Sequence, residues 1–150
     1  MKKYEVDYID GKRVEQLVIT SDYSLIGEHH GTVHVENGTL TISGELHGTL
    51  DIQNNTKVII MGEQHGTVYL GRNSVLIIHG ELHGSTTFDY NSNVIVEEGG
   101  RLSGTMTNYG TVIVKGVFGG AKTGNGKLLV EGNGYIKQPL IKDGISYFQW

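Results

Sequence analysis

The chain has 150 residues, 37% of them hydrophobic and 19% charged, which suits a single globular domain with its own core. Its 23 glycines and one proline argue against a helical protein, and the glycines lack the three-residue period of collagen. A net charge of −4 gives no basic surface for nucleic acid or an anionic membrane, and the absence of cysteine excludes disulfides and thiolate metal sites.

Residues 1–26 predict an N-terminal hairpin that caps the domain. Tyr4, Val6 and Tyr8 alternate with polar residues, Asp10-Gly11 is a turn signal, and Val14 with residues 17–19 forms the return strand. The first residues lack the apolar run of a signal peptide, and the longest apolar runs in the chain are four residues. We therefore expect a soluble, cytoplasmic protein with no membrane insertion and no nucleic-acid partner.

Residues 27–131 consist of one motif copied six times. The first four copies begin Gly-Glu-x-His-Gly, at Gly27, Gly44, Gly62 and Gly80, and two degraded copies begin at Gly100 and Gly116. Successive copies start 17, 18, 18, 20 and 16 residues apart. Apolar and polar residues alternate within each copy, which is the period of a β-strand. A unit this short cannot bury its apolar side alone, so neighbouring copies must stack.

The predicted fold is an all-β, single-domain β-solenoid of about six coils, which we expect to be right-handed although the repeat pattern does not fix the hand. Each coil adds about 4.8 Å to the stack. Turn-prone residues such as Asn54-Asn55, Asn73 and Asn91 mark the bends. The expected inward pairs are Leu40/Ile42, Val58/Ile60, Leu76/Ile78, Val94/Val96, Val112/Val114 and Leu128/Val130.

The repeat resembles that of the bactofilins, bacterial cytoskeletal proteins that form polymers. The residues that carry this resemblance run from Gly44 to Gly62 and read Gly-x-Leu-x-Gly-x-Leu-x-Ile, then Val-x-Ile-x-Gly. The resemblance covers about two thirds of the chain. It implies a compact β-helix that assembles end to end into non-polar filaments without a nucleotide.

Residues 132–150 predict a C-terminal aromatic cap. Pro139 interrupts the strand pattern, Asp143-Gly144 suggests a turn, and Tyr147, Phe148 and Trp150 place three aromatic residues in the last four. Such a segment either folds over the last coil or anchors a second molecule.

Stacking would turn equivalent outward positions into rows about 4.8 Å apart. Together the rows form a flat Glu/His/Thr face over four coils, which ends where the fifth copy has Arg101 and Ser103. The rows are Glu28, Glu45, Glu63 and Glu81; His30, His47, His65 and His83; and Thr32, Thr49, Thr67 and Ser85.

Four interpretations of this face remain open. The Glu and His side chains could simply pair across strands after duplication of the repeat, or the face could dock a partner protein. Neighbouring imidazoles could share Zn²⁺ or Ni²⁺, but an exposed linear array lacks four converging ligands. Catalysis needs one constellation with a cleft, and this face repeats one pattern four times. We expect a binding face, with no catalytic residue, no metal ligand and no cofactor.

A second surface is an aliphatic stripe on the outside of the other strand of each coil. The stripe and the aromatic tail are the expected self-association residues: Ile59, Ile77, Ile95, Ile113, Leu129, Tyr147, Phe148 and Trp150. The sequence thus favours a non-enzymatic, bactofilin-like scaffold that binds other copies of itself through coil ends and this stripe. The alternative is a monomeric or dimeric protein-binding module, such as an immunity protein that neutralises a bacterial toxin with the Glu/His/Thr face.

Overall fold

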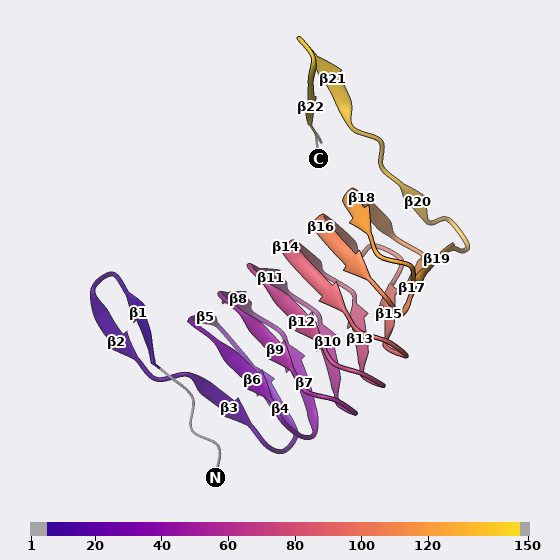
Figure 1. Cartoon of the computed structure of the whole chain (residues 1–150). Coiled ribbons are helices and arrows are strands. Elements are labelled where there is room, and N and C mark those ends of the chain that lie inside the picture. Colours follow the sequence, from indigo (N-terminus) through magenta and orange to yellow (C-terminus); the bar gives the residue numbers. More distant parts are fainter. Residues whose placement is uncertain (1–5, 148–150) are drawn as a thin grey trace.

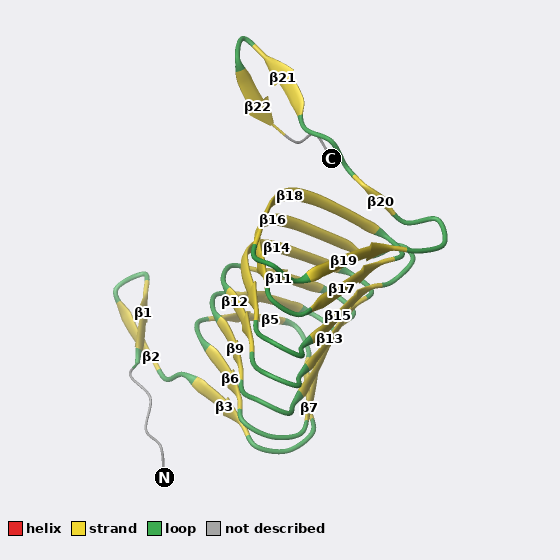
Figure 2. Cartoon of the chain, turned by 45° about the vertical axis from the view of Figure 1, so that its right-hand side comes forward, coloured by secondary structure: helices red, strands yellow, loops and turns green. Residues whose placement is uncertain are grey.

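The structure, a computed structural model, describes residues 6–147 and the side chains as far as residue 145. These residues form strands of two to eight residues joined by short turns and bends. No helix occurs among them, so none of the described chain has the long apolar helix that a bilayer crossing requires. The architecture is a stack of coils in which two parallel sheets face each other (Figures 1 and 2).

One sheet has seven parallel strands, one from each successive coil. In spatial order they are β4 (Tyr23–Leu25), β7 (Thr39–Ile42), β10 (Lys57–Ile60), β13 (Val75–Ile78), β15 (Asn93–Val96), β17 (Thr111–Val114) and β19 (Lys127–Val130). Each strand pairs with the equivalent strand of the next coil. Residues at equivalent positions of the repeat therefore lie opposite each other along the stack.

The second sheet has eleven strands, and the chain bends partway across this sheet in each of the early coils. Its main path is β3 (Leu17–Ile19), β6 (Val33–Val35), β9 (Leu50–Ile52), β12 (Val68–Leu70), β14 (Glu81–Phe88), β16 (Arg101–Asn108), β18 (Val117–Thr123) and β20 (Tyr135–Ile136). In the early coils a short strand precedes the main one: β5 (Glu28–His30), β8 (Glu45–His47) and β11 (Glu63–His65). In β14 and β16 the two segments join into one long strand.

Columns of aliphatic side chains fill the space between the sheets. The predicted inward pairs from Leu40 to Val114 are all fully buried, which confirms the strand alternation read from the sequence. The last pair differs, because no further coil covers it: Val130 is 48% exposed. The β-solenoid prediction is therefore confirmed, with an interior built mainly from Val, Leu and Ile.

Glycine is required where the second sheet bends. Gly48, Gly66 and Gly84 have φ of 149°, 132° and 147°, a range that L side chains rarely adopt. A Cβ atom at each would also clash with the backbone of the equivalent glycine one coil earlier. The recurring Gly at the end of each Gly-Glu-x-His-Gly motif thus permits the bend and the close stacking of coils.

The stack has about seven coils, one more than expected. The additional coil contains β3 and β4, which pair in parallel with β6 and β7. The predicted hairpin is shorter than expected, because only β1 (Asp7–Ile9) and β2 (Lys12–Val14) pair across the Asp10-Gly11 turn. Residues 17–19 join the stack instead of returning along the hairpin.

The C-terminal segment does not close the last coil within the described residues. Its strands β21 (Leu140–Lys142) and β22 (Ile145–Tyr147) form an antiparallel hairpin that projects away from the stack (Figure 1). Ile141 is 76% exposed and Ile145 is 67% exposed, so neither packs on the coils. The Tyr147 side chain, Phe148 and Trp150 lie outside the described residues.

Candidate binding face

Parallel pairing in register brings the Glu and His rows together on the outside of the bent sheet. β5, β8, β11 and the first half of β14 lie side by side, each glutamate opposite a glutamate and each histidine opposite a histidine. The geometry of the face is therefore the one expected from the repeat. The residues brought together are Glu28, Glu45, Glu63, Glu81, His30, His47, His65 and His83.

The first three imidazoles of the row stack face to face. Ring centroids of His30 and His47 are 4.9 Å apart with an interplanar angle of 14°, and those of His47 and His65 are 5.1 Å apart at 8°. The fourth ring turns away: His83 meets His65 edge-on at 6.3 Å and 62°. Three coils thus present one continuous imidazole stack, and the fourth breaks it.

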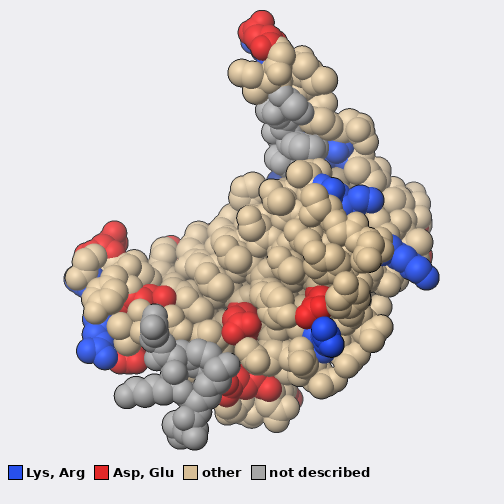
Figure 3. Space-filling model, in the orientation of Figure 1, with Lys and Arg blue, Asp and Glu red and all other residues tan. Residues whose placement is uncertain are grey.

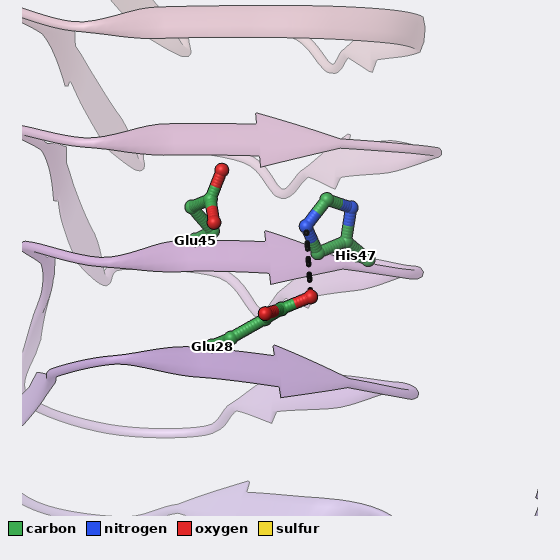
Figure 4. A group of neighbouring side chains, drawn as sticks. All are labelled: Glu28, Glu45 and His47. Carbon is green, nitrogen blue, oxygen red and sulfur yellow. Dashed lines mark ion pairs between the residues drawn. The ribbon is translucent and has the colours of Figure 1, made fainter.

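Ionic contacts link the two rows in the first three coils. The Nε2 atom of His30 lies 2.7 Å from Oε1 of Glu28, and the Nε2 atom of His47 lies 3.7 Å from that same oxygen across the strand pair (Figure 4). His65 lies 3.8 Å from Glu63 on its own strand. The side chains of His47 and His65 are 34% and 33% exposed, so these groups remain accessible from solvent.

The carboxylates also approach each other along their row. A hydrogen bond that the neutral Glu63 carboxyl can donate to the Glu45 carboxylate raises the pKa of Glu63 above its ordinary value, and partial burial and the charge of Glu45 act in the same direction. The Glu63 carboxyl group therefore holds its proton more tightly than an isolated carboxyl group does.

Side chains of the Glu and His rows point toward one another more closely than a linear array of parallel side chains would. One ligand atom from each of Glu28, Glu45 and His47 lies within 4.8 Å of the other two, and Glu45, Glu63 and His65 repeat this arrangement one coil later. The sequence predicted the rows but not this convergence, which depends on side-chain torsions.

The N-terminal hairpin lies against the near end of the face. The Asp7 carboxylate accepts hydrogen bonds from the backbone amide and hydroxyl of Thr32, at 2.6 and 3.0 Å. A shallow cavity of about 300 Å³ lies where the hairpin meets the face, and His30, His47 and Thr49 line it on the coil side. Thr67, in the third coil, lies beyond this cavity.

A polar network that the sequence did not predict holds the hairpin in place. Gln16 donates to Asp7 and also contacts His34, which reaches Asp51 one coil away at 2.8 Å. His34 is only 7% exposed. Its outward position on β6 gave no sign of burial, because the segment that covers it comes from 18 residues earlier in the chain.

The aliphatic stripe lies on the outer face of the seven-stranded sheet, as its parity predicted. Five aliphatic side chains follow Thr41 in register from β10 to β19, four of them half-buried and the last, Leu129, 45% exposed. They are Ile59, Ile77, Ile95, Ile113 and Leu129. The two surfaces proposed from the sequence therefore lie on different sheets of the solenoid.

A third feature is an aromatic cluster at one row of turns, which the sequence analysis missed. The rings of Tyr90 and Tyr109 stack at 5.3 Å, and the Arg72 guanidinium lies 5.8 Å from the Tyr90 centroid. The Tyr69 hydroxyl donates to Asp89 at 2.6 Å, which lowers the pKa of Asp89 and raises that of Tyr69. The only sequence signal for this cluster is a tyrosine before a turn residue, in Tyr90-Asn91 and Tyr109-Gly110.

No family model, curated protein or solved structure matches this chain.

Proposed function

We propose that the protein is a self-associating scaffold whose copies stack through the ends of their coils. The observation that carries this proposal is the state of the two ends, where strands of both sheets lack a neighbour among the described residues. At the N-terminal end β4 pairs only with β7, and β5 pairs only with β8. At the C-terminal end β19 pairs only with β17, and β20 covers two residues of β18. Unpaired edges of this kind bind further strands.

The apolar interior is also incomplete at the C-terminal end. Val130 occupies the same inward column as Val96 and Val114, yet it is 48% exposed because its coil is the last. A further coil from a second copy would cover this side chain as each coil covers the one before it. At the N-terminal end the edges are unpaired as well, although Ile19 and Leu25 are buried.

Charge is distributed along the stack in a way that favours head-to-tail contact. Residues 16–56 contain five acidic side chains and no Lys or Arg, whereas residues 102–142 contain five lysines and one glutamate. On the face drawn in Figure 3, Lys and Arg lie on the C-terminal coils and on the N-terminal hairpin, whereas Asp and Glu prevail over the first coils of the stack. Opposite charges attract the C-terminal end of one copy to the N-terminal end of the next. Such stacking would give a polar assembly, unlike the non-polar filaments that the bactofilin resemblance implies.

The stripe and the binding face have different places in this scaffold. The stripe supplies a flat apolar surface for lateral pairing, and the Glu/His/Thr face stays free for other ligands. The scaffold needs no catalytic group. The absence of membrane insertion and a cytoplasmic location remain predictions.

The test is the mass of the full chain across a hundredfold concentration range, measured by light scattering after size exclusion, with negative-stain microscopy of the densest sample. We expect the mass to grow with concentration at low salt. It should fall in 1 M salt, where the Debye length is about 3 Å. Val130→Lys should abolish growth, because lysine reaches solvent in the monomer but would be buried between stacked coils.

Thr105→Lys is the matched control, since it adds the same charge at an exposed position in the middle of the stack. It should assemble like the parent chain. A sharp monomer or dimer at every concentration would refute stacking and favour the protein-binding alternative. Equal assembly of Val130→Lys and Thr105→Lys would refute stacking through the C-terminal coil end.

A further inference from the structure

We propose that the first three coils of the binding face hold a divalent cation of the zinc class between Glu45 and its neighbours. The ligands would be two glutamate carboxylates from adjacent coils and one imidazole. Two overlapping triplets offer this donor set, Glu28/Glu45/His47 and Glu45/Glu63/His65. This inference does not depend on self-association.

The donor atoms are close to the spacing that zinc requires. Ligands of a tetrahedral zinc ion lie about 3.4 Å apart when bonds are about 2.0–2.1 Å long. The three atoms of each triplet already lie within 4.8 Å of one another. Figure 4 shows the first triplet, Glu28, Glu45 and His47. The side chains of Glu28, His47, Glu63 and His65 are 33–56% exposed, so rotation about their χ angles can close the difference. The fourth position would be left to water.

The electrostatics of the row favour a cation at the same place. Glu45 and Glu63 lie opposite each other on paired strands. Among the described residues, no Lys or Arg forms an ion pair with either of them. A divalent ion between these strands would place a positive charge beside both carboxylates.

The fourth coil gives an internal contrast. It carries the same Glu and His, but Nη1 of Arg101 lies 3.3 Å from Oε1 of Glu81. Nδ1 of His83 lies 2.6 Å from the Ser103 hydroxyl, which accounts for its turned ring. The Arg101 guanidinium therefore engages the Glu81 carboxylate, and the hydrogen bond with Ser103 engages the His83 imidazole. The site is confined to the first three coils because the fifth copy of the repeat replaces Glu and His by Arg and Ser.

The experiment is isothermal titration of zinc chloride into the full chain, produced without a polyhistidine tag. We expect saturable binding, with one ion per chain in the first step, because both triplets share Glu45. Glu45→Gln should weaken zinc binding by at least about tenfold, since loss of a direct ligand costs no less than loss of a supporting residue. His79→Gln is the matched control, an exposed histidine at the end of β13 outside the face, and should leave the affinity within about twofold.

The double variant His47→Gln/His65→Gln provides a second test should Glu45→Gln fail to fold, as judged by circular dichroism. It removes the imidazole from both triplets and should also abolish the first binding step. Absence of saturable binding by the parent chain would overturn the proposal. Equal zinc affinity of the parent chain and the folded face variants would overturn it as well.

Discussion

At the scale of single residues, His29 is a polar group at an inward position of the stack. Leu46, Gln64 and Leu82 fill this position in the following coils, and the buried Nε2 atom of His29 has no hydrogen-bond partner. Burial, reinforced by the charge of His30, lowers the pKa of His29 below 6.5, against an opposing effect of Asp7. As pH falls through 6.5, the unfolded chain takes up a proton that the folded chain resists. His29 therefore reduces the stability of the fold as the solution becomes acidic.

His29→Leu should raise the free energy of unfolding at pH 7 by about 1 kcal/mol, because it removes an unsatisfied buried nitrogen. It should also reduce the loss of stability between pH 7 and pH 5. Urea denaturation at low micromolar concentration measures both effects. The control His79→Leu changes an exposed histidine and should keep the pH dependence of the parent chain. Equal pH dependence in both variants would show that His29 is not the responsible group.

At the scale of the element, the bend of the second sheet depends on glycines in contact between coils. Gly84 has φ of 147°, and a Cβ atom there would meet the Gly66 carbonyl of the coil before. Gly99 has φ of 84° but open space around its missing Cβ. The two positions separate the cost of backbone strain from the cost of a clash between coils.

Gly84→Ala should destabilise the fold by about 3 kcal/mol or more, and Gly99→Ala by about 1 kcal/mol. Midpoints of urea unfolding give the comparison. Similar losses for the two variants would mean that the coils can separate locally to admit a methyl group, so close stacking at the bend would not be required.

The same elements show what could be predicted from the sequence. Alternation repeated over six copies predicts the strands, the inward pairs and the Glu and His rows, because stacking in register converts sequence position directly into spatial position. The three residues Leu17–Ile19 are too few to distinguish a return strand from a coil strand. The burial of His34 depends on a segment that covers it. The convergence of Glu28, Glu45 and His47 depends on side-chain torsion angles. Neither feature produces a periodic pattern in the sequence.

At the scale of the whole molecule, the aliphatic stripe gives the solenoid one apolar side. Thr41 on β7 precedes four isoleucines on adjacent strands, and Leu129 on β19 ends the row. A row of this kind is complementary to a second copy of itself, because flat sheets pack face to face about 10 Å apart. We expect it to pair two stacks side by side, while the coil ends lengthen each stack.

Ile77→Lys/Ile95→Lys places two charges at the centre of the stripe on the adjacent strands β13 and β15. Lateral pairing should be lost, so microscopy should show single stacks, and the mass at a given concentration should fall about twofold. Thr87→Lys/Thr107→Lys is the matched control, because it adds the same charges at outward positions of the adjacent strands β14 and β16 on the other sheet. The control should keep paired stacks. An unchanged oligomeric state and melting temperature in the stripe variant would refute the lateral interface and leave coil-end stacking as the sole mode of association.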